Sequence, residues 1–370
     1  MCSSGEKSRR GPEIPLPALH LPYSFKEMRA NRIRPGKAGS ELDFLREIRA
    51  RAGRGVRGSS VRLGIGDDCA LLDLRPGEEL AVTTDLSIAG RHFRMDWHPP
   101  ESVGHRTLAR GLSDLAAMGA RPVAAFLSLG VPRDLTKRHG RGSSWVDRFF
   151  AALFRLADAY KTPLAGGDLA ESPVAVADIV LVGAVPAGKA LRRSGARAGD
   201  LLYVTGSLGG SAAGLARLSR LQRTAGRRLW TSPARIPADL ASHLFPQPRV
   251  LQGLALQRRG LASAAIDLSD GLSTDLAHLC EESRVGAVIE KNALPVGKGA
   301  SVEQALHGGE DYELLFAARP SVRLPRSIAG VPITRIGHVT APKRNSPAVL
   351  IDTGSGTTPV EPHGWQHFRS

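Results

Sequence analysis

Six short segments of this chain combine acidic residues with glycine or other small residues, and they constrain the fold more than any other feature. Glycine lets the backbone approach a ligand closely, and a buried carboxylate without a partner is strongly destabilising. Because two carboxylates about 4 Å apart repel by roughly 4 kcal/mol at an effective dielectric near 20, carboxylates that converge need cations among them. The six segments are Gly64–Asp68, Thr83–Asp85, Leu112–Gly119, Ala165–Asp168, Asp267–Gly271 and Gly308–Glu313.

Oxygen ligands next to glycine turns favour Mg²⁺ that carries phosphates. Mg²⁺ takes one or two carboxylates and completes its shell with water and phosphate oxygens. The sequence contains no P-loop motif and no G-x-G-x-x-G motif that opens a helix after a strand. The turn Gly206–Ser211 is compatible with an anion site at a helix N-terminus and equally with a tight strand-to-helix connection.

The chain has 370 residues and a formal net charge of +15, which is unevenly distributed. Residues 1–60 hold 13 Lys and Arg against 6 Asp and Glu, and residues 215–260 hold 9 against 1. A basic surface can attract nucleic acid. Aromatic residues make up only 5% of the chain, however, so a stacking platform for single strands is not indicated. A solvated tail and arginine-rich helix faces are favoured over nucleic-acid binding.

Three cysteines, Cys2, Cys69 and Cys280, are too few and too widely spaced for a disulfide scaffold. They suit a reducing compartment, so we expect a cytoplasmic protein. The longest apolar runs fall short of the ~20 residues of a membrane span, and the N-terminus lacks the apolar segment of a signal peptide. We therefore expect no membrane association.

The order of predicted elements favours two α+β domains. Residues 1–40, which are rich in Pro, Ser and Arg, are predicted to be a disordered extension. Residues 41–187 are predicted to form an N-terminal domain, and residues 188–370 a C-terminal domain. Strands and helices are mixed without regular βαβ alternation, which argues against a doubly wound sheet. Predicted helices cover 41–52, 145–160, 211–221, 250–259 and 272–282, with another from Pro99–Pro100 to just before Gly119; predicted strands cover 61–65, 80–84, 123–129, 173–185, 201–205, 264–268, 287–290, 312–317 and 333–339.

Two aspartates are the best individual candidates for metal ligands. Asp114 lies on a small, apolar helix face, where it needs either a metal ion or a salt bridge with Arg110. Asp267 falls at the carboxyl end of a strand, where ligands often bind. After it, Asp270-Gly271 could form a hairpin, but the helical spacing of the following leucines favours a helix capped by Ser269 or Asp270.

Three other residues are ambiguous on the sequence alone. Asp168 follows two glycines, which suit a simple turn or a nucleotide contact through exposed backbone N–H groups. His92 and Trp365 more commonly have structural roles, as a lone histidine and as a core tryptophan near the C-terminus.

Taken together, the segments resemble the thiamine-monophosphate kinase family, which belongs to the superfamily of aminoimidazole ribonucleotide synthetase. The resemblance extends from about Glu41 to the end of the chain. G-I-G-D-D-C-A-L-L, T-T-D…A-G-R-H-F, L-S-D-L-A-A-M-G-A, A-G-G-D, L-R-R-S-G-A, A-I-D-L-S-D-G-L and A-L-H-G-G-E-D-Y-E-L-L-F occur in the family's order. Gly111 differs from the asparagine of many relatives.

The resemblance implies a two-domain, PurM-like α+β fold in which strands of the N-terminal domain pair across a homodimer. It implies ATP-dependent phosphorylation of thiamine monophosphate to thiamine diphosphate, with several Mg²⁺ ions. The metal ligands implied are Asp68, Thr83, Thr84, Asp85, Asp114, Asp168, Asp267 and Asp270; the ATP contacts are Gly167, Asp168, Arg193 and Ser269; the substrate contacts are His92, Glu310 and Trp365.

Phosphoryl transfer to a phosphate agrees with this set of residues. The acceptor oxygen is already ionised at neutral pH, so the reaction needs positioning and divalent ions and no general base. We therefore assign no acid–base catalyst. Two alternatives remain: another ATP-dependent synthetase of the same superfamily, or a basic nucleic-acid-binding protein.

Overall fold

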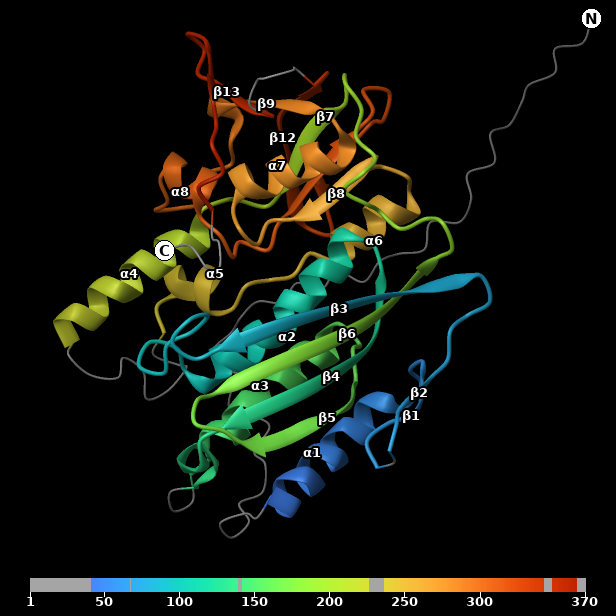
Figure 1. Ribbon diagram of the computed structural model, residues 1–370, viewed down its shortest axis with the longest axis vertical. Coiled ribbons are helices and arrows are strands. Elements are labelled where there is room, and N and C mark those ends of the chain that lie inside the picture. Colours follow the sequence, from blue (N-terminus) through green and yellow to red (C-terminus); the bar gives the residue numbers. More distant parts are fainter. Residues whose placement is uncertain (1–40, 67, 139–141, 226–235, 343–347, 365–370) are drawn as a thin grey trace, which may run out of the picture.

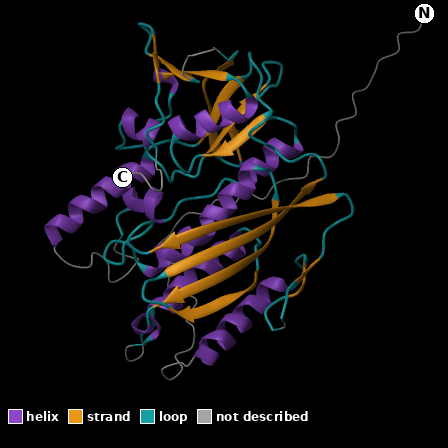
Figure 2. Ribbon diagram, viewed as in Figure 1, coloured by secondary structure: helices purple, strands orange, loops and turns teal. Residues whose placement is uncertain are grey.

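The structure, a computed structural model, describes residues 41–66, 68–138, 142–225, 236–342 and 348–364 (Figure 1). A four-stranded sheet with helices behind it forms the lower part of the molecule in this view, and a larger sheet with its own helices forms the upper part (Figures 1 and 2). The sheets are mainly antiparallel and the helices are packed on them without regular βαβ alternation, which agrees with the predicted α+β class. The proposed extension 1–40 lies outside the described residues, and the domain limits stay predictions.

The lower sheet has the strand order β3-β6-β4-β5, in which only β4 and β5 run parallel. Helices α2 and α3 cover one face, and α1 lies beside β5 (Figure 1). A small β1-β2 ribbon follows α1. The elements are α1 (Glu41–Val56), β1 (Val61–Leu63), β2 (Leu71–Leu72), β3 (Glu78–Ile88), α2 (Pro100–Ala117), β4 (Arg121–Val131), η2 (Arg133–Thr136), α3 (Trp145–Ala159), β5 (Leu164–Glu171) and β6 (Val176–Pro186).

The upper sheet has the order β14-β13-β9-β12-β7-β10-β8, and β11 pairs with β12. Its elements are β7 (Leu201–Thr205), α4 (Gly210–Ala225), η4 (Ala238–Leu240), α5 (Ala241–Leu244), α6 (Val250–Arg258), β8 (Ala264–Asp267), α7 (Leu272–Ser283), β9 (Gly286–Glu290), η5 (Lys291–Ala293), α8 (Val302–His307), β10 (Leu314–Ala318), β11 (Ser327–Ile328), β12 (Val331–Thr340), β13 (Val349–Asp352) and β14 (Thr357–Pro359).

Helix α2 is the junction between the two parts. Pro100 opens it, and Gly119, with φ of 64°, follows its end, as the sequence predicts. A Cβ at Gly104 would lie 2.1 Å from the carbonyl oxygen of Phe149 on α3, and one at Gly253 on α6 would lie 2.0 Å from that of Ala116. The glycines thus allow α2 to contact both helices closely, and one hydrophobic core spans α2, α3, the lower sheet and α6.

The local structure differs from the sequence expectation in two places. The A-G-G-D segment, for which the sequence left a simple turn open, lies in the edge strand β5, Leu164–Glu171. The glycines of this segment do not favour a strand, because glycine weakens strand interiors. The parallel pairing of β5 with β4, a long-range contact, outweighs this local preference. The predicted strand 312–317 begins later, at Leu314, because Tyr312 has a φ of 51°. No helix within the described ranges is long and apolar enough to cross a membrane.

Candidate active site

The centre of the candidate site is a group of carboxylates between β3 and α2. The hydroxyl of Thr83 donates a hydrogen bond to the carboxylate of Asp114 on α2. Asp85, two residues after Thr83, faces the same side of β3, and its Oδ2 lies 3.0 Å from Nε of Arg110. Arg110 is therefore paired with Asp85, and the salt bridge with Asp114 that the helical spacing suggested is not the contact that forms.

The strand β8 adds a further carboxylate to this group. Asp267 ends β8, is 4% exposed, and accepts a hydrogen bond of 2.8 Å from the hydroxyl of Ser113. Because Ser113 is the neighbour of Asp114 on α2, the end of β8 lies against the C-terminal part of that helix. We call Thr83, Asp85, Asp114 and Asp267 the carboxylate cluster.

The turn after β8 is held by a residue that the sequence analysis did not select. The backbone N–H groups of Asp270 and Gly271 both donate to the carboxylate of Asp275, at 3.0 Å. Helix α7 begins at Leu272, directly after Gly271. The predicted helix is therefore confirmed, and the alternative of an Asp270-Gly271 hairpin is not. The group that binds the free N–H groups is the carboxylate of Asp275 in the first turn, and not a side chain of Ser269 or Asp270.

The cluster is electrostatically strained. Burial raises the pKa of Asp85 to about 6, with Arg110 opposing the rise and Asp114 adding to it. Burial is also the main cause that raises the pKa of Asp114, against the hydrogen bond from Thr83. Burial and then the charge of Asp114 raise the pKa of Asp267 to about 7. Each carboxylate thus lacks part of the solvation that an anion requires.

This strain is what a bound cation would relieve. Within the described ranges, no three His, Cys, Asp or Glu side chains already converge as a set of metal ligands. The donors are nevertheless hard carboxylate and hydroxyl oxygens, desolvated and mutually repelling, which suits Mg²⁺. The residues present therefore fit the ion that the sequence predicts.

A second group of predicted ligands lies in a separate cavity. Asp68, Gly167 and Asp168 line a cavity of about 440 Å³ next to β5. Its walls are largely apolar, including Ile65 and Phe126, with the two aspartates among the few polar groups. Such a lining suits the base of a nucleotide beside charged groups.

The sheet separates the two groups. Asp85 on β3 is in register with Ile179 on β6, which pairs with Leu127 on β4, which pairs with Gly167 on β5. Three strand spacings of roughly 4.8 Å each therefore lie between Asp85 and Gly167. One chain does not bring Asp68 and Asp168 to the carboxylate cluster.

Thr84 also differs from its neighbours. Side chains alternate along a strand, so Thr84 points to the face of β3 opposite to Thr83 and Asp85. That face carries the exposed side chains of Leu80, Val82 and Leu86, which are 50%, 60% and 45% exposed. We call it the open face of the sheet.

Two predicted ATP contacts lie close to the cluster. The charge of Arg193, in the connection before β7, lowers the pKa values of Asp114 and Asp267, although burial raises both overall. The carbonyl oxygen of Ser269 accepts a hydrogen bond of 2.7 Å from the backbone N–H of Glu310. Ser269 therefore joins the end of β8 to the segment that carries a predicted substrate ligand.

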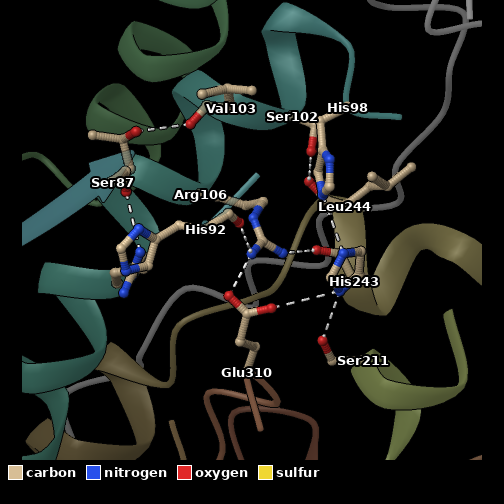
Figure 3. Close-up of polar contacts among 12 residues, drawn as sticks. Ser87, His92, His98, Ser102, Val103, Arg106, Ser211, His243, Leu244 and Glu310 are labelled. Atoms are coloured by element: carbon tan, nitrogen blue, oxygen red, sulfur yellow. Dashed lines mark hydrogen bonds and ion pairs between the residues drawn. The ribbon is translucent and has the colours of Figure 1, made fainter. Parts of the chain in front are cut away.

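Glu310 is held by Arg106, which is 4% exposed (Figure 3). The guanidinium group of Arg106 forms an ion pair with Glu310 and donates hydrogen bonds to the carbonyl oxygens of His243 and His92. Glu310 has a φ of 66°, a conformation that costs a non-glycine residue free energy and is concentrated at functional sites. One arginine thus links the loops that carry both predicted substrate ligands, His92 and Glu310.

The ring of His92 is itself fixed, because its Nδ1 accepts a hydrogen bond of 3.1 Å from the backbone N–H of Ile88. This contact closes the turn after β3. The remaining predicted substrate ligand, Trp365, lies outside the described residues.

Two buried histidines extend this network across the two parts of the molecule. Nε2 of His98, just before α2, lies 3.1 Å from Nε2 of His243 on α5, whose Nδ1 lies 3.0 Å from the hydroxyl of Ser211 (Figure 3). Burial lowers the pKa of both histidines well below the usual value of 6.5. Both histidines are thus neutral, and the Nε2 of one ring donates a hydrogen bond to the Nε2 of the other.

The other acids of the G-G-E-D-Y-E segment have structural partners. The backbone N–H groups of Gly209 and Ser211, at the start of α4, donate to the carboxylate of Asp311. The anion at this helix N-terminus is therefore a side chain of the protein, which favours the structural alternative for the turn Gly206–Ser211. Glu313 forms an ion pair with Arg249, at 2.5 Å.

Comparisons with known proteins decide the family. Residues 66–188 match the family described as AIR synthase related protein, N-terminal domain, and residues 197–349 match its C-terminal domain. Thiamine-monophosphate kinase of Escherichia coli (strain K12) is 43% identical over 295 residues, which cover 76% of this chain and 85% of that protein. This chain belongs to the thiamine-monophosphate kinase family.

Solved structures support the same family. A crystal structure of thiamine-monophosphate kinase from Stenotrophomonas maltophilia K279a has a TM-score of 0.71 and 36% identity, and the match covers 85% of this chain and 96% of that one. A structure of AaThiL complexed with AMPPCP and TMP has a TM-score of 0.67 and 30% identity, and covers 89% of this chain and 97% of that one. The resemblance and the fold class predicted from the sequence are confirmed.

Sequence reasoning selected most acidic residues of the site in this member of the thiamine-monophosphate kinase family. It missed the basic residues that contact those acids. Arg106 and Arg249 were not singled out, and neither was His243. Arg106 carried one weak signal, since it lies four residues before Arg110 and so on the same face of α2. Arg249 and His243 have no local signal, because their side-chain partners are more than 30 residues away in the sequence.

Proposed function

We propose that this protein transfers the γ-phosphoryl group of ATP to thiamine monophosphate and forms thiamine diphosphate and ADP. The observation that carries the proposal is the carboxylate cluster beside Glu310, in a chain of this family. The relative complexed with AMPPCP and TMP holds an ATP analogue and TMP together, which supports the same pair of ligands here.

The residues of the cluster would position the reacting groups. We assign Asp85, Asp114 and Asp267, with Thr83 and Asp270, to Mg²⁺, which would neutralise charge on the phosphates when bound. The acceptor is an ionised phosphate oxygen, so the chain needs to align two polyanions and does not need to remove a proton. Glu310 and His92 would hold the thiamine phosphate, together with Trp365.

The nucleotide would use two surfaces. We assign the cavity at Asp68, Gly167 and Asp168 to ATP and its metal ions, and Arg193 and Ser269 to contacts near the carboxylate cluster. These two surfaces lie apart within one chain. We therefore propose that a second copy of the chain completes the site.

We propose a homodimer that buries the open face of β3, where Thr84 lies. Leu80, Val82 and Leu86 form a row of exposed apolar side chains there, which a monomer rarely leaves in water. A partner chain that covers this row would agree with the pairing of strands across a homodimer, which the family resemblance implies. A cytoplasmic location, suggested by the free cysteines Cys69 and Cys280, is part of the same proposal.

The decisive experiment is a product assay. The purified chain is incubated with ATP, Mg²⁺ and thiamine monophosphate, and thiamine diphosphate is measured by chromatography. Asp114→Asn and Asp168→Asn should each lower turnover by at least about a hundredfold, because each removes a charge from a proposed metal ligand. Asp134→Asn is the control, since the side chain of Asp134 is 81% exposed and belongs to neither group.

The outcomes separate the alternatives. Nucleotide binding without thiamine diphosphate would favour another synthetase of the superfamily. A nucleic-acid-binding protein would instead show affinity for nucleic acid that falls steeply with salt and survives Asp68→Asn and Asp114→Asn. Full kinase activity in both of those variants would contradict the metal assignment.

A further inference from the structure

Arg110 is a cation placed inside the carboxylate cluster. Its Nε lies 3.0 Å from Oδ2 of Asp85, and its Nη1 donates a hydrogen bond of 3.1 Å to the hydroxyl of Ser87. The side chains of Arg110 and Asp85 are only 16% and 22% exposed. The pair is therefore largely withdrawn from solvent, where charges act on one another more strongly than at a surface.

The guanidinium group acts on more than one carboxylate. Its charge opposes the rise in pKa that burial causes at Asp85 and at Asp114. Burial alone would lower the pKa of Arg110, but Tyr312, Asp85 and Glu310 raise it above its usual value. Arg110 thus remains charged and faces two proposed metal ligands and one proposed substrate ligand.

We propose that Arg110 is a positioning residue that acts as a built-in cation of the cluster. It keeps Asp85 oriented before any metal ion arrives, and it weakens the binding of Mg²⁺ to the cluster in the absence of nucleotide. This inference rests on the proposed function in one respect only, namely that the cluster is a site for Mg²⁺.

The physical reason is charge balance. Without Arg110, Asp85 and Asp114 would face each other desolvated, and the first divalent cation to enter would bind tightly. With Arg110 in place, an entering Mg²⁺ meets a fixed positive charge. The phosphates of a nucleotide bring negative charges that offset it, so Mg²⁺ enters together with the nucleotide and not before it.

The test is a calorimetric titration of the full-length chain with MgCl₂, without nucleotide. In Arg110→Gln the dissociation constant for Mg²⁺ should fall by about tenfold or more, since a nearby positive charge has been removed. Arg110→Lys keeps the charge and should stay close to the wild type.

Arg121→Gln is the matched control. Arg121 pairs with Glu78 at the other end of β3, at 2.9 Å, so this substitution also leaves a β3 carboxylate without its arginine. Because Glu78 is remote from the cluster, Arg121→Gln should leave Mg²⁺ affinity unchanged.

Thermal unfolding gives a second readout that does not depend on activity. Arg110→Gln should unfold at a lower temperature than the wild type in EDTA, and MgCl₂ should raise its midpoint more than it raises that of the wild type. The double variant Asp85→Asn/Arg110→Gln removes both charges of the pair. In EDTA it should unfold at a higher temperature than Arg110→Gln alone.

Unchanged or weaker Mg²⁺ affinity in Arg110→Gln would overturn the proposal. So would an Arg110→Gln protein that fails to fold with and without Mg²⁺, because its role would then be structural. The product assay reports on the proposed function separately: a chain that makes thiamine diphosphate but shows no effect of Arg110→Gln on metal binding refutes this inference alone.

Discussion

At the scale of single residues, the site depends on cations that come from distant parts of the chain. Arg106 contacts Glu310 and the carbonyl oxygens of His92 and His243, and is almost fully buried. A carboxylate that lost such a partner would be free to turn away or to become protonated. The orientation of Glu310 is therefore set by a residue on α2.

Arg106→Met should raise the KM for thiamine monophosphate by tenfold to a hundredfold, which corresponds to about 1.4–2.8 kcal/mol. The KM for ATP should change by much less, because the carboxylate of Glu310 is assigned to thiamine monophosphate and Ser269 accepts its hydrogen bond from the backbone N–H of Glu310. Arg106→Lys should recover part of the loss. Steady-state kinetics with each substrate varied in turn measures these values.

Arg148→Met is the control for general destabilisation, since Arg148 pairs with Glu101 on the far side of α2 at 2.7 Å. Equal changes in both KM values for Arg106→Met would argue against a role in holding Glu310.

The histidine pair His98–His243 predicts acid sensitivity. Both pKa values lie below 6.5 in the folded protein, so the unfolded chain binds more protons at low pH. This contribution to stability is complete above about pH 6.5 and is lost as the pH falls, by at most about 1.4 kcal/mol per pH unit for each proton. Arg106 disfavours protonation of both rings, whereas Glu310 favours it at His98.

Denaturant unfolding at pH 5 to 8 would measure the slope. His243→Gln should flatten it, whereas His278→Gln, at an exposed position on α7, should not. The same slope in His243→Gln and in the wild type would contradict the neutral pair.

At the scale of elements, α2 packs against the lower sheet and against β8 of the upper sheet, so its position fixes how the two sheets lie relative to the site. Gly104 lets α2 approach α3, because any Cβ there would collide with the carbonyl oxygen of Phe149. The same helix carries Arg106, Arg110 and Asp114 toward the site. A shift of α2 would therefore move all three side chains together.

Gly104→Ala should lower the free energy of unfolding by about 3 kcal/mol, since backbone atoms cannot move aside as a side chain can. Thermal or denaturant unfolding measures this loss. Gly53→Ala is the matched control on α1, where a Cβ would meet nothing within 4 Å. It should stabilise the protein by about 0.5–1 kcal/mol, because alanine restricts the unfolded chain. Equal effects of the two substitutions would contradict the packing argument.

At the scale of the whole molecule, the separation of the two ligand groups makes assembly part of the site. If the open face of β3 is buried in a homodimer, Val82→Glu should convert the dimer to a monomer and abolish most activity. Light scattering after gel filtration measures the mass. Leu215→Glu, which charges an exposed apolar residue on α4, should leave the mass unchanged. A wild-type monomer with full activity would contradict the assembly.

The extension 1–40 lies outside both the family motifs and the described residues. Deletion of residues 1–38 should therefore leave kinase activity and thermal stability unchanged. The shortened and the full-length proteins can be compared in the product assay and by thermal unfolding. Loss of activity or of stability in the shorter chain would show that the extension belongs to the fold.

The sequence alone determined much of the local structure and the family. Helix α2 could be predicted from Pro99, Pro100 and Gly119, because proline and glycine restrict the backbone through contacts within a few residues. The motif order was sufficient to identify the family. Asp114 stood out because a carboxylate among small apolar residues needs a partner, and Asp267 because ligands often bind at the carboxyl end of a strand.

Only the tertiary structure decided which partner each acid has. Arg110 pairs with Asp85 and not with Asp114, Asp311 caps α4, and Asp168 lies in a cavity separate from the cluster. Each outcome depends on the packing of elements that are distant in the sequence, and on which face of the sheet a strand presents. Such long-range contacts are set by the packing of the whole fold, so no local pattern specifies them.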